Sequence, residues 1–212
     1  MEYSLAGELA QGLDSLGLNL DKATQEKLLA FLDLLAKWNR SYNLTAVRKP
    51  AQMLVRHLFD SLVIHPHLHG SQVLDVGTGA GLPGIPLALV CPQYHFTLLD
   101  SNSKKTRFVT QAVAELGLDN VTVVQSRVEV FAPPVKFDTI VSRAYSSLAE
   151  FVSGVEHLLA IDGVLMAMKG VYPATELTEL PKPYTLAKNI ELRVPLLDAE
   201  RNLLIIKKID PL

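Results

Sequence analysis

Apolar residues in the first third of the chain recur with the spacing of a helix. Between residues 21 and 39 they lie three and four positions apart, on one face: Leu28, Phe31, Leu32, Leu35 and Trp38. Asp21 is suited to cap the N-terminus of this helix. The polar stretch 39–47 predicts a loop, and Pro50 suits the first turn of a further helix that ends before Pro66. We therefore expect residues 1–65 to be mainly helical.

After Gly70 short apolar runs alternate with helical patterns. The runs predict buried strands at 72–76, 96–100, 121–125, 137–142 and 163–169, and the patterns between them predict helices at 83–90, 103–116, 127–131 and 147–159. Such alternation is typical of an α/β fold, a parallel sheet with helices on both faces. Two extended segments without an intervening helix, 184–194 and 202–209, predict a C-terminal antiparallel hairpin. This change in the hydrophobic pattern predicts two parts of the chain, residues 1–68 and residues 69–212.

Composition narrows the class of protein. Hydrophobic residues make up 49% of the 212 residues, which is enough for a substantial core. A net charge of -2 argues against a protein held on nucleic acid by bulk charge alone. The single cysteine, Cys91, excludes an internal disulfide and a cysteine-rich zinc site. No long apolar run is present and the N-terminus carries Glu2 and Glu8, so we expect a cytoplasmic protein without a membrane segment.

A glycine-rich loop follows the first predicted strand. It reads DVGTGAGLPG from Asp75 to Gly84, with glycines at 77, 79, 81 and 84. Glycines at this spacing let the backbone turn tightly and approach a ligand at a helix N-terminus. Asp100 ends the second predicted strand, where an acid suits ribose hydroxyls. We therefore predict an adenosine-containing ligand, held by Gly77, Gly79, Gly81 and Asp100. The alternatives are a glycine turn that serves only packing and a helix-capping role for Asp100.

Two details favour S-adenosylmethionine over a nicotinamide cofactor. Asp75 stands at the end of the strand, where a carboxylate would repel a pyrophosphate but can bind the methionine ammonium or order the loop. Pro83 and Pro86 remove two N–H donors that a pyrophosphate would use. After the third strand, Val128 is placed to pack on an adenine ring and Glu129 to meet its amine, unless this segment is a plain helix start.

Seven motifs in order resemble one bacterial family. They are KWN at 37–39, YNLT at 42–45, RH at 56–57, DS at 60–61, DVGTGAGLPGIPLA at 75–88, SRA at 142–144 and MKG at 168–170. Together they are similar to the RsmG (GidB) family, 16S ribosomal RNA guanine-N7 methyltransferases that use S-adenosylmethionine, over essentially the whole chain. The resemblance implies a class I, Rossmann-like methyltransferase domain with a seven-stranded mixed sheet, and an N-terminal helical extension that contacts RNA. It also implies a cofactor site lined by Gly77, Leu82, Val128, Glu129 and Arg143.

The edge of the fourth strand carries no carboxylate. Guanine N7 has an in-plane lone pair and no proton, so methyl transfer to it requires no general base. It requires only that N7, the methyl carbon and the sulfur be held in line. The strand ends in Ser142-Arg143-Ala144-Tyr145, without the acidic turn common in enzymes that methylate exocyclic amines. Arg143 is the candidate catalytic residue, bonding guanine O6 or the cofactor, unless it is a surface arginine. Tyr145 is a candidate for base stacking or for the core.

Basic residues gather in two stretches. Residues 34–59 contain no acid but five cations: Lys37, Arg40, Arg48, Lys49 and Arg56. Lys104, Lys105 and Arg107 form a second group. We predict RNA contacts from Arg48, Arg56, Lys104 and Arg107, and from Lys169 of the MKG motif, unless these are plain solvated faces. The expected partner is 16S ribosomal RNA or the small ribosomal subunit, and we expect the protein to be a monomer. We expect no metal site at His65, His67 and His69, because no nearby acid or cysteine would complete the set of ligands. A methyltransferase with another substrate and a non-catalytic RNA-binding module are the alternatives.

Overall fold

The N-terminal third is helical, as predicted. This computed structural model describes residues 4–143 and 145–209. Helix α1 (Leu5–Ser15) precedes α2 (Lys22–Tyr42), where the Asp21 carboxylate accepts a hydrogen bond from the Thr24 amide at 2.7 Å, which confirms the cap. Helix α2 runs three residues beyond the predicted end, to Tyr42, and its C-cap Asn43 has the left-handed conformation. Helix α3 (Pro50–Met53), a π-helical turn (Leu54–Phe59) and α4 (Asp60–Leu62) follow without a break.

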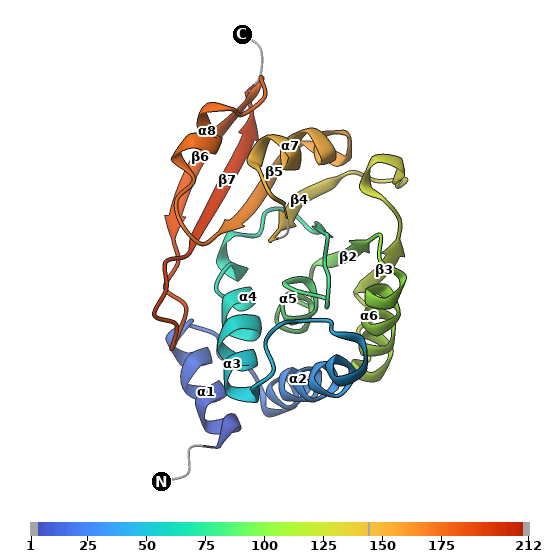
Figure 1. The fold of residues 1–212 in the computed structure, drawn as a ribbon, viewed down its shortest axis with the longest axis vertical. Coiled ribbons are helices and arrows are strands. Elements are labelled where there is room, and N and C mark those ends of the chain that lie inside the picture. The colour runs from blue at the N-terminus through green and yellow to red at the C-terminus, as the bar shows by residue number, and fades with distance from the viewer. Residues whose placement is uncertain (1–3, 144, 210–212) are drawn as a thin grey trace.

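The remainder forms a seven-stranded mixed sheet in the order β3-β2-β1-β4-β5-β7-β6 (Figure 1). Its five parallel strands are β1 (Gln72–Val76), β2 (His95–Asp100), β3 (Val121–Gln125), β4 (Phe137–Ser142) and β5 (Leu159–Lys169). Strands β6 (Tyr184–Glu191) and β7 (Asn202–Lys208) form the predicted antiparallel pair, with β7 inserted next to β5. The fold class that the alternation indicated is confirmed.

The helices of this part are α5 (Gly84–Val90), α6 (Ser103–Leu116), α7 (Leu148–Val155) and α8 (Ala174–Thr178). Two predicted helices were too long. Residues 127–131 contain only a 3-10 turn, Val128–Val130. The helix predicted at 147–159 ends in a 3-10 turn at Leu158 because Leu159 already pairs with Phe137 of β4 and begins β5.

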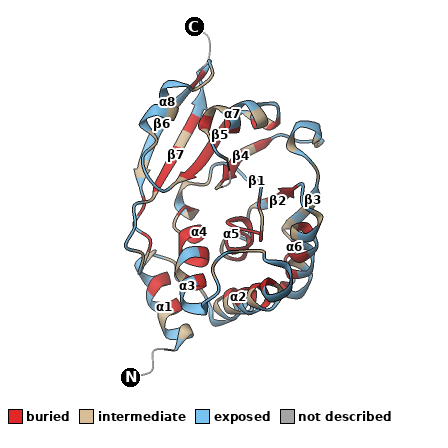
Figure 2. Ribbon diagram, in the orientation of Figure 1, coloured by how far each residue is buried: buried red, intermediate tan, exposed pale blue. Residues whose placement is uncertain are grey.

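The buried side chains of the sheet pack into two cores, and Figure 2 marks the buried positions along the strands in red. Phe96, Leu98 and Met166 pack with α1, α2, α5 and α6, whereas Leu74, Leu99 and Leu165 pack with α7. The N-terminal helices share the first core, and α1 lies so close to the π-helical turn that a Cβ on Gly12 would be 2.0 Å from the Phe59 ring. The boundary at residue 68 stays a prediction. No helix in the described ranges is long and apolar enough to cross a membrane.

The order of the strands creates a crevice. The chain leaves β1 towards α5 on one face and leaves β4 towards α7 on the other, and β1 and β4 are neighbours. Ligands of open α/β sheets bind at the carboxyl ends of the strands at such a reversal. The glycine loop, Asp100 and Arg143 all follow strands at this edge.

Candidate active site

The glycine loop is tied to the two central strands. The amides of Gly77 and Thr78 donate to the Leu99 carbonyl at 2.8 and 3.1 Å. The buried Asp75 Oδ2 accepts from Thr78 Oγ1 at 2.6 Å and from the Gly84 amide at 2.8 Å. Burial raises the pKa of Asp75 to about 6, against the opposing effect of these two hydrogen bonds. These contacts order the loop, the second of the two roles expected for this carboxylate.

Asp100 links the loop to the start of α6. Its Oδ2 accepts from the Gly79 amide at 2.9 Å, its Oδ1 accepts from the Asn102 amide at 2.8 Å, and Lys105 Nζ lies 4.0 Å from Oδ2. The N-cap of α6 is Asn102, so the capping alternative for Asp100 is wrong. A carboxylate has about four acceptor sites, and two donors leave capacity for ligand hydroxyls.

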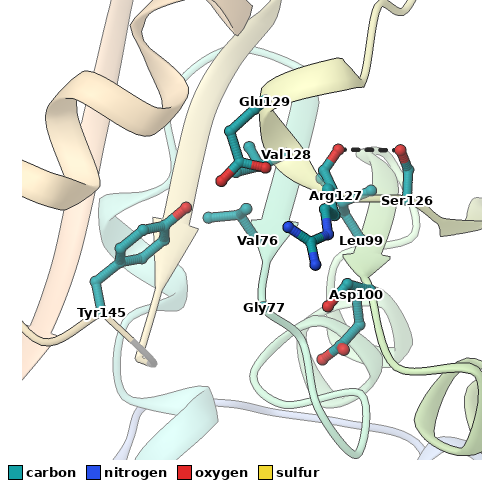
Figure 3. A pocket seen from close by; sticks show the side chains of 10 residues that line it. Val76, Gly77, Leu99, Asp100, Ser126, Arg127, Val128, Glu129 and Tyr145 are labelled. Atoms are coloured by element: carbon teal, nitrogen blue, oxygen red, sulfur yellow. Dashed lines mark hydrogen bonds between the residues drawn. The ribbon is translucent and has the colours of Figure 1, made fainter.

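A cavity of about 310 Å³ opens at the ends of β1, β2 and β3 (Figure 3). It brings together four predicted residues, Gly77, Asp100, Val128 and Glu129. Its size is at the lower end of the range for small-ligand sites. A backbone φ of +70° at Gly77 keeps this part of the wall free of a side chain, and Asp100 and Glu129 supply acceptors. This donor and acceptor set fits an adenosine with its ribose hydroxyls and exocyclic amine.

The sequence reasoning missed several residues of this cavity. Val76, Leu99, Ser101, Ser126 and Arg127 also line it, and Figure 3 shows the Arg127 guanidinium extending towards Asp100. Their signal was position alone, because each lies within two residues of a residue already predicted.

Tyr145 faces Glu129 across the cavity (Figure 3). It is half-buried, and its ring centroid lies 5.2 Å from that of Phe151. Burial raises the pKa of Tyr145 above its ordinary value, and the charges of Glu129 and Glu150 raise it further. The phenol therefore stays protonated at neutral pH and can donate a hydrogen bond into the cavity.

A second cavity has a volume of about 430 Å³. Arg143 lines it, whereas Tyr145 lines the first cavity. Four cationic side chains are among the residues that line it: Arg56, Arg143, Lys169 and Arg201. Three of them were predicted site residues, and Arg201, which no motif indicated, was missed.

Asp60 holds two of these arginines. Its Oδ2 accepts from Arg143 Nη1 at 3.0 Å, and its Oδ1 accepts from Arg201 Nε at 2.7 Å. The carboxylate is 9% exposed and the two arginines about a quarter. Arg143 is therefore an anchored residue and not a free surface arginine. A further cation of this cavity is paired as well, because Lys169 Nζ lies 2.9 Å from Glu176 of α8.

The other predicted residues lie apart from the cavities or on the surface. Asp75 and Leu82 are buried and line neither cavity, so a cofactor contact from either stays a prediction. The ligand-contacting roles of Gly79 and Gly81 also stay predictions. Arg48, Arg56, Lys104 and Arg107 are exposed, as RNA contacts require.

In the described part of the chain, no three His, Cys, Asp or Glu side chains gather as metal ligands. Ala144 of the SRA motif lies outside the described residues.

A buried histidine supports the floor of the second cavity. His57 Nε2 lies 2.9 Å from Thr45 Oγ1, and the Thr45 amide donates to Asn39 Oδ1 at 2.9 Å. Burial and, to a smaller extent, the charge of Arg143 lower the pKa of His57 to about 4. The imidazole is therefore neutral at physiological pH.

We expect His57 to destabilise the fold as the pH falls from about 6.5 to 4. The unfolded chain binds the proton more tightly, so up to about 3 kcal/mol of stability should be lost through this group. Asp75 acts in the opposite direction over nearly the same range, because its pKa is raised by burial. The test is therefore the difference in unfolding free energy between wild type and His57→Gln, measured by urea denaturation across this range. A difference that does not change with pH would contradict the assignment.

The chain was compared with known proteins. The profile of the family described as "rRNA small subunit methyltransferase G" matches residues 24–205. A ribosomal RNA small subunit methyltransferase G from Klebsiella pneumoniae is 50% identical over 203 residues, which cover 96% of this chain and 98% of that protein. The corresponding protein from Yersinia pseudotuberculosis is 52% identical over 200 residues, covering 92% and 97%.

Solved structures agree on the fold. A SAM-dependent methyltransferase from Aquifex aeolicus superposes with a TM-score of 0.58 at 18% identity, covering 81% of this chain and 97% of that one. The glycopeptide N-methyltransferase MtfA, complexed with S-adenosylmethionine, gives 0.57 at 14% identity, covering 72% and 87%. The chain therefore has the class I methyltransferase fold and, as its motifs predicted, belongs to the rRNA small subunit methyltransferase G family.

Proposed function

We propose that this protein transfers a methyl group from S-adenosylmethionine to N7 of one guanine in 16S ribosomal RNA. The observation that carries the proposal is a pair of cavities, one lined by Tyr145 and Asp100 and the other by Arg143. One offers acceptors for an adenosine, and the other offers cations for a nucleotide. Similarity to the methyltransferases named above supports the same substrate class. We infer that the enzyme works in the cytoplasm as a monomer on RNA or on the small ribosomal subunit.

The first cavity would hold the cofactor through distinct groups. Asp100 would accept hydrogen bonds from both ribose hydroxyls, since its two oxygens each have remaining acceptor capacity. Val128 would pack on the adenine and Glu129 would accept from its amine. When bound, S-adenosylmethionine supplies an electrophilic methyl group on its sulfonium.

The second cavity would hold the guanine. Arg143 would donate to guanine O6 with the guanidinium N–H groups that Asp60 does not occupy. Asp60 fixes the orientation of that guanidinium, and Lys169 and Arg56 would bind the flanking phosphates. Alignment of N7 with the methyl group is the main contribution of the chain, and proximity effects of this kind supply up to about 7–11 kcal/mol.

The proposed chemistry predicts a flat pH profile. Guanine N7 has no proton to lose, and no carboxylate among the described residues follows β4 at its edge. His57 titrates near 4 and the pKa of Tyr145 is raised, so neither ionises near neutrality. The rate of single-turnover methyl transfer should be nearly constant between about pH 6.5 and 8.5. A required general base would instead make the rate rise with pH as that base loses its proton. A log-linear rise of the rate with pH would contradict the base-free mechanism.

The function itself is tested by nucleoside mass spectrometry. Small subunits from cells lacking the gene should gain one 7-methylguanosine in 16S RNA when incubated with the purified protein and S-adenosylmethionine. Subunits from cells that retain the gene are the control and should gain none. Methylation of another base, or of no base, would overturn the proposal.

A further inference from the structure

Three aromatic rings form a continuous series of contacts from the core to the surface. The Trp38 ring centroid lies 5.7 Å from that of Phe108, a fully buried residue of α6, and 5.1 Å from that of Tyr42. The Trp38 and Tyr42 rings are inclined by 30°, so they stack. Tyr42 nevertheless remains 47% exposed. Trp38 therefore covers one face of Tyr42, while nearly half of the residue's surface stays accessible to solvent.

The backbone fixes this open ring in place. Tyr42 is the last residue of α2, and the left-handed Asn43 turns the chain back on the helix. Asn39 holds the loop that follows, because its side chain accepts from the Thr45 amide at 2.9 Å and donates to the Val47 carbonyl at 3.3 Å. A preorganised aromatic side chain loses little conformational entropy when it binds a partner.

The surroundings of the ring favour an anionic partner. Residues 34–59 contain no acid, and their cations Lys37, Arg40, Arg48, Lys49 and Arg56 are all exposed. None of the ion pairs among the described residues includes any of these five. The Arg48 guanidinium is placed beside the end of α2 by a 3.2 Å hydrogen bond to Asn43 Oδ1. The contact between Trp38 and Phe108 joins α2 to α6, which lie side by side (Figure 1), and α6 carries the exposed Lys104 and Arg107.

The same loop leads to the second cavity. Val47, five residues after Tyr42, lines that cavity together with Arg56. A nucleic-acid strand with one base in the cavity would therefore pass along the exposed arginines to the aromatic ring. Exposed aromatic faces among cations bind unpaired bases by stacking, whereas duplex RNA offers no free base face there.

We infer that Tyr42 is a stacking platform for an unpaired RNA base close to the methylated nucleotide. The inference rests on the proposed RNA substrate. It gives the enzyme a preference for single-stranded RNA that does not depend on charge. Arg40 and Arg48 hold the backbone of the same strand, and Trp38 holds the platform.

Three variants separate stacking from packing. Tyr42→Phe keeps the ring, Tyr42→Leu keeps apolar contact with Trp38 but lacks a planar face, and Tyr42→Ala removes both. Affinity for a short single-stranded RNA, with S-adenosylhomocysteine present, should stay close to wild type in the Phe variant. It should fall about 5- to 150-fold in the Leu and Ala variants, the usual loss for one stacked base. Affinity for the same sequence as a blunt duplex should not change.

Salt dependence and fluorescence supply independent measurements. Tyr42 carries no charge, so its variants should keep the wild-type salt dependence, whereas Arg48→Ala should reduce the slope by about one unit. Trp38 is the sole tryptophan of the 212 residues, and its emission in the wild-type protein should change on titration with the single-stranded RNA. A Leu variant that binds like wild type, equal losses on both RNAs, or unchanged emission at saturation would each overturn the inference.

The inference and the proposed function can fail separately. Ring-dependent binding of single-stranded RNA without methylation of 16S RNA would remove the proposed function alone. Methylation by an enzyme whose Tyr42→Leu variant binds RNA normally would remove the platform alone.

Discussion

Asp100→Ala should lose most of its affinity for S-adenosylmethionine. The side chain would offer acceptors to two ribose hydroxyls, and hydrogen bonds to a charged group contribute about 1.5–3 kcal/mol each. Two such bonds correspond to a loss of about 150-fold or more. The variant also removes the acceptor of the Gly79 amide, which loosens the glycine loop that forms the rest of the site. Isothermal titration with S-adenosylhomocysteine measures the effect.

The conservative change and a second ligand provide the controls. Asp100→Asn keeps one acceptor oxygen and should lose less affinity than Asp100→Ala. NAD should bind neither the wild-type protein nor the variants, and the affinity for single-stranded RNA should remain. A loss below about fivefold, or about 1 kcal/mol, would remove Asp100 from the ribose site.

Asp60→Asn should lower both the stability and the rate of methyl transfer. The carboxylate bridges Arg143 and Arg201, which come from segments 83 and 141 residues away along the chain. An amide can accept from only one arginine and turns its NH₂ group towards the other, so two partly buried cations lose their counterion. Breaking a fully buried pair costs about 3–5 kcal/mol, and we expect about 2–4 kcal/mol here because the arginines keep some exposure to solvent.

The rate should fall because Arg143 loses its fixed orientation. Misplacement by about 1 Å can reduce a rate about 100-fold. Arg143→Ala, which removes the contact itself, should reduce single-turnover transfer by about 10- to 150-fold. Adding Arg201→Gln to Asp60→Asn should restore part of the stability, since it removes one unpaired cation, but should not restore the rate. Urea denaturation and single-turnover assays distinguish these results, and a stability change below about 0.5 kcal/mol would contradict the bridging role.

Local pattern alone determined most of the fold. Helical periodicity predicted α2 and its Asp21 cap, and short apolar runs predicted all seven strands and the C-terminal pair, because these features depend on neighbours along the chain. The loop DVGTGAGLPG and the position of Asp100 likewise predicted the ligand-facing edge of the sheet. The predictions failed where the sheet overrode local preference, as at Leu159, which pairs with Phe137 although its segment has a helical pattern.

The tertiary structure decided which charged groups meet and what each carboxylate does. Asp60 belongs to the DS motif and Arg201 to no motif, and they lie in different halves of the chain, so no local spacing could pair them. Asp75 and Asp100 end adjacent strands, yet one is buried within the loop and the other borders a cavity, because burial depends on the side chains that surround each strand end. The neutral state of His57 and the stack that carries Tyr42 arise in the same way, from packing between elements that are distant in sequence.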